Sequence, residues 1–253
     1  MELRGTTAIV TGGARRLGRA IALALAARGA NLVVHYGHSA EAAARVVAEA
    51  RALGVEAVAV EADFGRPALV GRVVEEAVAR FGRAEVLVNS AAIFEPGGVL
   101  DTDEATWDRH FAVNLKAPFF LSQAFARALP PGVSGKIVNI TDYRALRPGT
   151  DHVAYTLTKA GLVTLTQVLA QALAPRVAVN AVALGAILPP PGAGPGHLER
   201  LARAVPLRRH GAPDDVIAAV LFLLEGSDFI TGTTLVVDGG AHLGPVRGTQ
   251  TVE

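Results

Sequence analysis

Residues 6–29 read TTAIVTGGARRLGRAIALALAARG, and this stretch decides the fold. Its first five residues form an apolar run typical of a buried strand, and the pattern from Arg16 to Arg28 predicts a helix. A glycine-containing turn between a strand and a helix can bind pyrophosphate, because backbone N–H groups and the helix dipole both face the anion. We therefore expect Gly12, Leu17 and Gly18 to contact a nucleotide cofactor.

Two adjacent arginines, Arg15 and Arg16, stand inside this turn. The turn by itself leaves three roles open for them. They can belong to the phosphate cradle, they can belong to a substrate pocket, or they can be ordinary solvated charge. Only features elsewhere in the chain can separate these roles.

Strand and helix patterns alternate along almost the whole chain. Most strand candidates are short, continuously apolar and rich in valine, as expected for strands covered on both faces. Such alternation predicts an α/β fold with a parallel seven-stranded sheet and helices on both faces. The expected strands are Thr6–Val10, Asn31–Tyr36, Ala57–Glu61, Val86–Asn89, Lys136–Thr141, Val177–Val182 and Thr234–Val237. The expected helices are Arg16–Arg28, Ser39–Leu53, Pro67–Phe81, a long region Asp103–Leu129, Val153–Leu173, His197–Ala204 and Pro213–Leu224.

One segment departs from this alternation. Leu184–Gly196 reads LGAILPPPGAGPG, and its prolines and glycines exclude a helix or a central strand. It follows the sixth expected strand, at the sheet edge where doubly wound proteins bind ligands. The segment is therefore a candidate lid, with a variable surface loop as the alternative.

The composition excludes several classes of protein. The chain has 253 residues, a formal net charge of +1 and no cysteine. We therefore expect no nucleic-acid partner, no disulfide and no metal site. No apolar run approaches the ~18 residues that span a bilayer, and the amino terminus leaves no room for a signal peptide. These features favour a cytoplasmic protein without a membrane association.

The end of the second expected strand helps to identify the cofactor. NAD-binding proteins usually carry an acidic residue there for the ribose 2′-hydroxyl, whereas this segment, VVHYGHSAEA, has none before Glu41. Donors gather instead, and we expect a site for the 2′-phosphate of NADPH. Its residues are His35, Tyr36, His38 and Ser39, with Arg15 approaching from the first turn. The alternative is that these polar residues only begin a helix, with Ser39 as its N-cap.

Other strand ends add expected cofactor contacts. Asp63, followed by Phe64, comes after the third strand and can accept a hydrogen bond from the adenine amino group. Small residues at the end of the fourth strand let the cofactor pass close to the backbone. The expected contacts from these and later strand ends are Asn89, Ser90, Ala91 and Gly185.

Tyr155 and Lys159 are the strongest catalytic candidates. They lie four residues apart in AYTLTKAGL and therefore share one face of a helix. A lysine beside a phenol stabilises the phenolate, so we expect Lys159 to lower the tyrosine pKa and make the phenol a usable acid.

Together with other landmarks, this pair resembles the short-chain dehydrogenase/reductase family over nearly the whole chain. The landmarks are TG in the first turn, FAVNLKAP around Asn114, IVNIT, YTLTK and ITGTTLVVDGG. The resemblance implies one Rossmann-type, doubly wound domain over residues 1–243, a C-terminal tail at 244–253 and carbonyl or imine reduction with a nicotinamide cofactor. It implies Tyr155 as proton donor, Lys159 as the ligand of the nicotinamide ribose and Asn114 as the holder of a relay water. It also implies a homotetramer paired through the helices of 103–129 and 153–173.

The departures from the family pattern are more specific. Asp142 stands thirteen residues before Tyr155, where the family has serine, and Arg16 replaces a glycine. Leu184-Gly185 replaces Pro-Gly after the sixth strand. The first two departures, an HY-x-x-S segment and Phe94 five residues beyond Asn89 resemble the pteridine reductase branch.

This branch resemblance implies a pterin substrate. Phe94 would stack on the flat heterocycle, and Arg16 would face both the cofactor phosphates and the pterin edge. Asp142 would help Tyr155 to deliver protons to ring nitrogens. By position, the remaining pocket residues would be Tyr143, Leu184, Leu188 and His197.

Each assignment has a simpler alternative. Phe94 can be a loop anchor, Arg16 can bind phosphate only, and Thr141 can supply the missing hydroxyl if Asp142 lies on the surface. The functional alternatives are a broader carbonyl reductase, such as a 3-oxoacyl-thioester or sugar/polyol reductase, and a nucleotide-binding regulator without turnover. The intact Tyr155, Lys159 and Asn114 argue against the regulator.

Overall fold

The computed structural model describes residues 1–190 and 192–244, so almost all of the expected tail at 244–253 lies outside the described residues. Seven parallel strands form one sheet in the order β3-β2-β1-β4-β5-β6-β7, which confirms the expected α/β sheet. The strands are β1 Thr7–Val10, β2 Asn31–Tyr36, β3 Ala57–Glu61, β4 Val86–Asn89, β5 Gly135–Asp142, β6 Val177–Leu184 and β7 Thr234–Val237.

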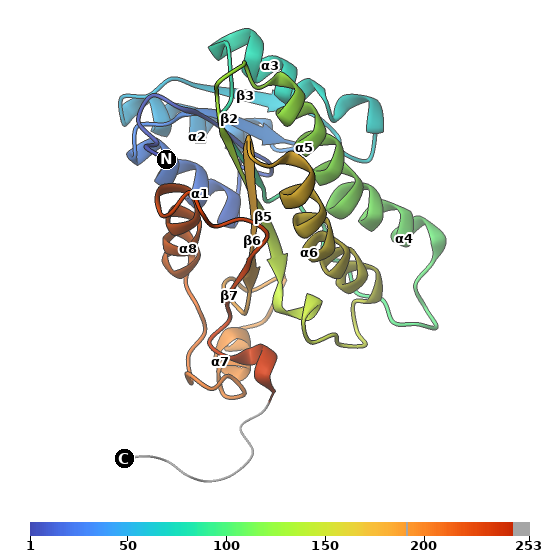
Figure 1. Cartoon of the computed structure of the whole chain (residues 1–253). Helices are drawn as coiled ribbons and strands as arrows, with labels where there is room; N and C mark the ends of the chain where they lie inside the picture. Colours follow the sequence, from blue (N-terminus) through green and yellow to red (C-terminus); the bar gives the residue numbers. More distant parts are fainter. Residues whose placement is uncertain (191, 245–253) are drawn as a thin grey trace.

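Helices cover both faces of the sheet, as Figure 1 shows. Side chains of α1, α2 and α8 pack with Ala8 and Val10 of β1 on one face, and those of α3, α5 and α6 pack with Ile9 on the other. Successive residues of a strand point to opposite faces, which explains why every residue of β1 is buried. The helices are α1 Arg16–Ala27, α2 Ala40–Ala52, α3 Arg72–Phe81, α4 Glu104–Phe111, α5 Ala117–Ala128, α6 Val153–Leu173, α7 His197–Ala202 and α8 Pro213–Glu225. The shorter turns are η1 Pro67–Leu69, η2 Ala112–Lys116, η3 Tyr143–Ala145 and η4 Ala241–Leu243.

The long helical region expected over Asp103–Leu129 is interrupted. A π-helical turn, η2, separates α4 from α5 and ends at Lys116, just before Pro118. Proline lacks an N–H group and its ring crowds the carbonyl group four residues earlier, which here belongs to Asn114. The wider turn accommodates this proline, and the Asn114 side chain within it is buried.

The turn between β1 and α1 depends on two glycines and one histidine. Gly12 adopts a left-handed φ of +64°, and any side chain at Gly18 would overlap the carbonyl oxygen of Gly12. The N–H of Gly12 donates to His35 Nδ1 at 3.1 Å, and His35 Nε2 donates to the carbonyl oxygen of Ala62 at 2.8 Å. The ring of His35 also stacks on Phe64, with centroids 4.0 Å apart. The histidine thus joins the first turn to the segment after β3.

These contacts correct two expectations. His35 was expected to donate to a 2′-phosphate, but it is only 2% exposed and both ring nitrogens already bond to backbone. Burial lowers the pKa of His35 to about 4, so the ring is neutral at neutral pH. Phe64 is buried against it, so its side chain is a core contact and not a cofactor contact. His35 acts on the turn that would hold a cofactor.

We predict that His35 makes the fold sensitive to acid. The unfolded chain binds a proton at this residue below about pH 6.5, whereas the folded protein does so only near pH 4. Stability therefore falls as the pH drops through this window, by about 2 kcal/mol from this group between pH 7 and pH 5. Urea unfolding at both pH values should show a smaller loss for His35→Asn, which keeps an acceptor for Gly12 and cannot titrate.

The matched control is His38→Asn, which removes an exposed histidine of the same segment. It should retain the wild-type difference between the two pH values. Equal acid sensitivity of wild type and His35→Asn would show that His35 does not control it.

Candidate active site

Four elements meet at the carboxyl edge of the sheet, where doubly wound folds bind ligands. The end of β5 contributes Asp142, the first turns of α6 contribute Tyr155 and Lys159, and η2 contributes Asn114. Phe94 comes from the loop after β4. The structure brings these five sequence-predicted residues into one neighbourhood, as the following contacts show.

A hydrogen bond joins Tyr155 to Asp142. The phenol donates to Asp142 Oδ2 at 3.0 Å, while Asp142 Oδ1 accepts from the backbone N–H of Arg144 at 2.8 Å. Burial raises the pKa of Asp142, although the hydrogen bonds from Arg144 and Tyr155 and the charge of Lys159 oppose this rise. The Thr141 hydroxyl donates instead to the backbone of Lys159 at 3.0 Å. Asp142, and not Thr141, therefore faces the tyrosine.

Lys159 lies beneath the tyrosine ring. Its Nζ is 5.5 Å from the ring centroid of Tyr155 and donates to the carbonyl oxygen of Ile140 at 2.8 Å. Burial lowers the pKa of Lys159 to about 8, partly offset by Asp142. The pKa of Tyr155 is raised well above 10, mainly by burial and then by the charge of Asp142. The expectation that Lys159 lowers the tyrosine pKa is therefore wrong here, and Tyr155 keeps its proton.

Asn114 fastens the loop that carries Phe94. Its Oδ1 accepts from the N–H of Ile93 at 2.9 Å, and its Nδ2 donates to the carbonyl oxygen of Ile93 at 3.0 Å. Nδ2 also lies 3.3 Å from the hydroxyl of Thr158. The side chain is thus fully engaged, and its expected role toward a relay water stays a prediction.

Phe94 and His152 form an aromatic wall beside the hydrogen-bonded Tyr155 and Asp142, which we call the acid pair. The ring of Phe94 meets the ring of Tyr155 edge-on, with centroids 4.7 Å apart, and stacks on His152 at 4.0 Å. Phe94 is 42% exposed, so part of its ring remains available to a ligand. His152 is a site residue that was not expected from the sequence. Its position three residues before Tyr155, at the N-cap of α6, is the signal that could have identified it.

The ends of β1 and β4 approach each other closely. The Thr11 hydroxyl accepts from the N–H groups of Ser90 and Ala91 at 2.9 and 3.0 Å. A side chain on Gly12 would press on the backbone of Ala91. The backbone packing therefore requires a glycine at position 12, while the expected cofactor contacts of Ser90 and Ala91 stay predictions.

Two further strand ends close this edge. Gly185 ends the run of β6, and a side chain there would collide with the backbone of Asp238. Asn89 donates to Asn139 Oδ1 at 2.8 Å, while no donor among the described residues reaches its own buried Oδ1. That oxygen is an available acceptor at the edge where a cofactor is expected.

A basic hollow lies between the N-termini of α1 and α2. Its volume is about 390 Å³, and no acidic side chain lines it among the described residues. Ser39 occupies the N-cap position of α2 without making a capping hydrogen bond with its side chain, so the simple capping alternative lacks its defining contact. The hollow is lined by Ala14, Arg15, Arg16, Arg19, Ala42 and Arg45.

The other expected cofactor residues differ in their surroundings. His38 is exposed near the start of α2, and Tyr36 is half-buried against the helix layer. Asp63 Oδ1 accepts from the N–H of Gly65 at 2.9 Å, which engages one of its two carboxyl oxygens. Leu17 also packs at the edge of the core.

Arg16 connects the first turn to the proline-rich loop. It adopts a φ of +52°, in the left-handed region where the family pattern has glycine, and this costs roughly 1 kcal/mol. Its Nη2 donates to the carbonyl oxygen of Pro189 at 2.6 Å. Leu188 is half-buried against the core under this loop, and Tyr143 is half-buried in η3. The Leu184–Gly196 loop, the candidate lid, is thus joined to the first turn by the hydrogen bond from Arg16 to Pro189.

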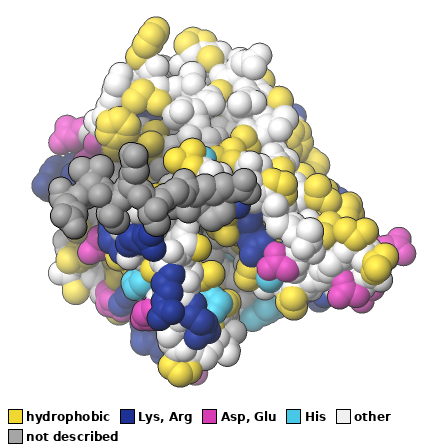
Figure 2. All heavy atoms as spheres, turned by 90° about the horizontal axis from the view of Figure 1, so that it is seen from below, with side chains coloured by type: hydrophobic (Ala, Val, Ile, Leu, Met, Phe, Trp, Pro, Cys, Tyr) yellow, Lys and Arg dark blue, Asp and Glu magenta, His cyan; other side chains and the backbone are white. Residues whose placement is uncertain are grey.

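Basic and histidine side chains gather on the face below the carboxyl edge of the sheet, as Figure 2 shows. Among the residues that the structure describes, no cluster of His, Asp and Glu is arranged to hold a metal ion. Within the same residues, no helix is long and apolar enough to cross a bilayer.

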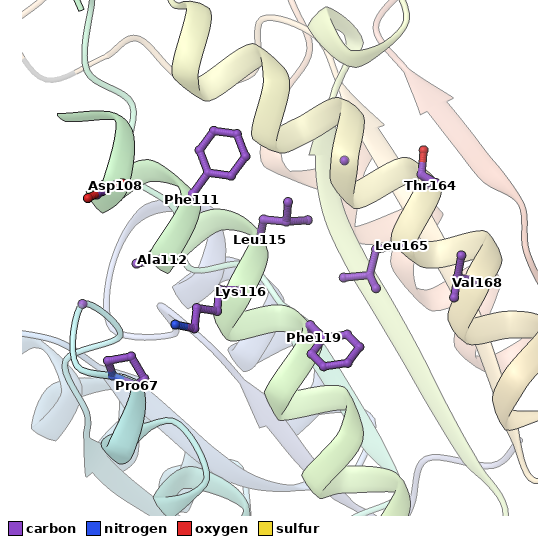
Figure 3. A pocket seen from close by; sticks show the side chains of 12 residues that line it. Pro67, Asp108, Phe111, Ala112, Leu115, Lys116, Phe119, Thr164, Leu165 and Val168 are labelled. Atoms are coloured by element: carbon purple, nitrogen blue, oxygen red, sulfur yellow. The ribbon is translucent and has the colours of Figure 1, made fainter. Parts of the chain in front are cut away.

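A second hollow lies elsewhere. It has a volume of about 810 Å³ and is lined by side chains of the α4–α5 run and of α6, which Figure 3 shows facing one another. Phe111, Leu115, Phe119 and Val168 make it mostly apolar, and neither Tyr155 nor Asp142 lines it. It is therefore a surface feature separate from the acid pair.

Comparison with known proteins agrees with this geometry. Residues 12–242 match the family model described as Enoyl-(Acyl carrier protein) reductase. The chain is 36% identical to a 3-oxoacyl-[acyl-carrier-protein] reductase of Synechocystis sp., covering 94% of this chain and 97% of the relative. It is also 36% identical to an L-rhamnose 1-dehydrogenase (NAD(P)(+)) of Sphingomonas sp., with 95% and 98% covered.

Solved structures extend the comparison. The FolM alternative dihydrofolate reductase 1 of Brucella canis, crystallised with NADP, superposes with a TM-score of 0.90 at 36% identity over 100% of both chains. A blue fluorescent protein from a metagenomic library, crystallised with NADPH, superposes with a TM-score of 0.88 at 34% identity over 95% of this chain and 99% of the other. With Tyr155, Lys159 and Asn114 gathered at the sheet edge, the chain belongs to the short-chain dehydrogenase/reductase family of oxidoreductases.

Proposed function

We propose that this oxidoreductase is an NADPH-dependent reductase of the pteridine reductase type, which transfers hydride to a dihydropterin or a related folate. The observation that carries the proposal is the buried carboxyl of Asp142 bonded to the phenol of Tyr155, where most of the family has a hydroxyl. A dihydrofolate reductase name among the similar structures supports the same substrate class.

The residues present fit NADPH. Gly12 and Gly18 allow the first turn to pack tightly against backbone, since a side chain at either position would meet Ala91 or Gly12, and this turn leads into the N-terminus of α1, where a pyrophosphate would bind. The basic hollow lined by Arg15 suits a 2′-phosphate, and Ser39 and His38, which precede α2 in the sequence, are the further proposed ligands. Bound NADPH supplies the hydride. The proposed location is the cytoplasm, which maintains a pool of this reduced cofactor.

The chain's own residues supply the protons and the orientation. A flat heterocycle stacks on the exposed part of Phe94, next to Tyr155. Tyr155 retains its proton and can donate it to a ring nitrogen. Asp142, whose pKa is raised by burial, takes up a proton from solvent and in this acid form returns a proton to the tyrosinate along their hydrogen bond. Lys159 supplies a fixed positive charge beneath the tyrosine ring and faces the ribose side of the site.

A second candidate is a broader carbonyl reductase. The observation that favours it is the 36% identity to 3-oxoacyl and sugar oxidoreductases over nearly the whole chain. In this case Asp142 would be a local replacement without a role in substrate choice. The two candidates differ in which substrate they turn over.

We predict NADPH oxidation with dihydrobiopterin or dihydrofolate, and a dependence of that activity on Asp142. Asp142→Ser should lower kcat/KM for dihydrobiopterin by about 100-fold or more, because the carboxyl that recharges Tyr155 is lost. NADPH binding, followed by fluorescence, should change little.

An acetoacetyl thioester, assayed in parallel, is the control substrate. Turnover of the thioester alone by the wild type would refute the pterin assignment. Unchanged pterin kinetics in Asp142→Ser would remove Asp142 from the mechanism.

We predict that Arg16 serves the substrate more than the cofactor. Arg16→Gly relieves the left-handed strain and breaks the bond to Pro189, so stability should stay within about 1 kcal/mol of wild type. NADPH affinity should persist, while pterin affinity should fall about tenfold or more through loss of a charged contact. Titration of each ligand by calorimetry measures both effects.

Arg15→Gly is the matched control, because Arg15 lines the same hollow on the proposed phosphate side. It should weaken NADPH binding. If Arg16→Gly loses NADPH binding to the same extent as Arg15→Gly, Arg16 is a phosphate ligand only.

The proposed enzyme is a homotetramer that uses the large apolar hollow of Figure 3 as one subunit contact. Val168, 53% exposed on α6, lines that hollow. We predict that Val168→Asp reduces the mass measured by light scattering from four chains to two, because a charge would be buried at the contact. Leu53→Asp is the control, since Leu53 is 52% exposed outside the hollow. A wild-type monomer would contradict the proposal.

A further inference from the structure

An ion pair spans the loop between β5 and α6. Arg144 donates from both terminal nitrogens to the two carboxyl oxygens of Asp151, at 2.5 and 3.1 Å. The Arg144 side chain is only 18% exposed, and Gly149 leaves the space that the guanidinium occupies. Asp151 is exposed, so what distinguishes this pair from a typical surface ion pair is its two-pronged geometry and the burial of the arginine.

One end of this pair reaches the proton-donating group. The backbone N–H of Arg144 holds Asp142 Oδ1, and the other oxygen of Asp142 accepts from Tyr155. The residue that orients the carboxyl through its backbone is therefore itself clamped through its side chain. Movement of Arg144 would turn the carboxyl away from the phenol.

The other end of the pair reaches the aromatic wall. Asp151 Oδ2 lies 3.1 Å from Nδ1 of His152, whose ring stacks on Phe94 at 4.0 Å and an interplanar angle of 6°. The backbone of Asp151 also accepts from the N–H of Gly97, and a parallel bridge joins Gly97 to His152. The loop bearing Phe94 is thus fixed to the same ion pair.

The pair also sets the charge around Asp142. The titratable and charged groups that face this carboxyl are Tyr155 and Lys159 from α6 and Arg144 from η3. The positive charge of Arg144 lowers the pKa of Asp142, against the effect of burial. Arg144 itself lowers the pKa of Asp151 to about 2, so Asp151 stays ionised and partly neutralises the guanidinium. Removing Arg144 should therefore raise the pKa of Asp142, and removing the charge of Asp151 should lower it.

We propose that Arg144 and Asp151 form a positioning pair that couples the seating of a substrate ring against Phe94 to the orientation and charge environment of Asp142. The inference rests on the proposed function, in which Asp142 and Tyr155 deliver the proton. Neither residue needs to touch the substrate. The pair fixes the position of Asp142 relative to Phe94, so its loss affects both proton delivery and substrate affinity.

The test compares the pH dependence of kcat/KM in Arg144→Gln and Asp151→Asn. In the proposed mechanism, activity requires the protonated form of Asp142, so kcat/KM falls as the pH rises through the pKa of Asp142. Arg144→Gln removes a cation and should move this fall upward by about half to one pH unit, whereas Asp151→Asn frees the cation and should move it downward by a similar amount. In both variants KM should rise about three- to tenfold, because the stack of His152 and Phe94 loosens.

Two further variants separate charge from geometry. Arg144→Lys keeps the charge but not the two-pronged contact. The pH at which its kcat/KM falls (the pH limb) should therefore match the wild type, while its KM should be raised. Arg80→Gln breaks the ion pair between Arg80 on α3 and Glu56 just before β3, and should change neither the pH dependence nor KM. Shifts of the pH limb in the same direction for Arg144→Gln and Asp151→Asn, or no shift in either, would overturn the proposal.

The assay separates this proposal from the substrate assignment. Dihydrobiopterin and an acetoacetyl thioester are used in parallel, since the acid pair serves either. If only the thioester is turned over, the pterin assignment fails and the pH limbs still report on the pair. The infrared band of the protonated Asp142 carboxyl, identified by its absence in Asp142→Asn, can be followed against pH without turnover. The pH at which this band disappears should move upward in Arg144→Gln and downward in Asp151→Asn.

Discussion

The partly buried hydrogen bond between Tyr155 and Asp142 is the contact on which the rest of the site depends. Placing a carboxyl group in this interior is unfavourable unless donors compensate it. The phenol and the N–H of Arg144 provide those donors, and Lys159 provides a nearby charge. The result is a tyrosine that keeps its proton beside a carboxyl whose pKa is raised. This arrangement suits protonation of a ring nitrogen more than polarisation of a ketone by a hydroxyl.

The scaffold brings distant segments to this bond by closing one sheet edge. Thr11 ties the end of β1 to the residues after β4, and buried His35 ties the first turn to the end of β3. Arg16 then spans from that turn to the loop after β6. The cofactor side and the substrate side therefore share one rigid frame, in which a strained arginine replaces an unstrained glycine. Retaining that strain is consistent with a functional role for Arg16.

Much of the fold could be predicted from sequence, because strand and helix periodicity are local. The seven expected strands agree with the structure to within two residues, and the register that placed Asp142 opposite Tyr155 held. Local pattern could not show that His35 faces inward, since a strand covered on both faces has no polar side to mark direction. It also could not show the tyrosine pKa, which depends on burial as well as on neighbouring charge. The contacts of Arg144, Asp151 and His152 depend on loop geometry, which periodicity does not encode.

The crystal structure of the complex with NADPH and dihydrobiopterin tests the central claim most directly. We expect the pterin ring to stack on Phe94, with a ring nitrogen within hydrogen-bonding distance of the Tyr155 phenol and the Asp142 carboxyl beside it. Arg16 should lie at the edge of the same ring. A ring bound away from Phe94, or one whose nitrogens face neither Tyr155 nor Asp142, would contradict the account.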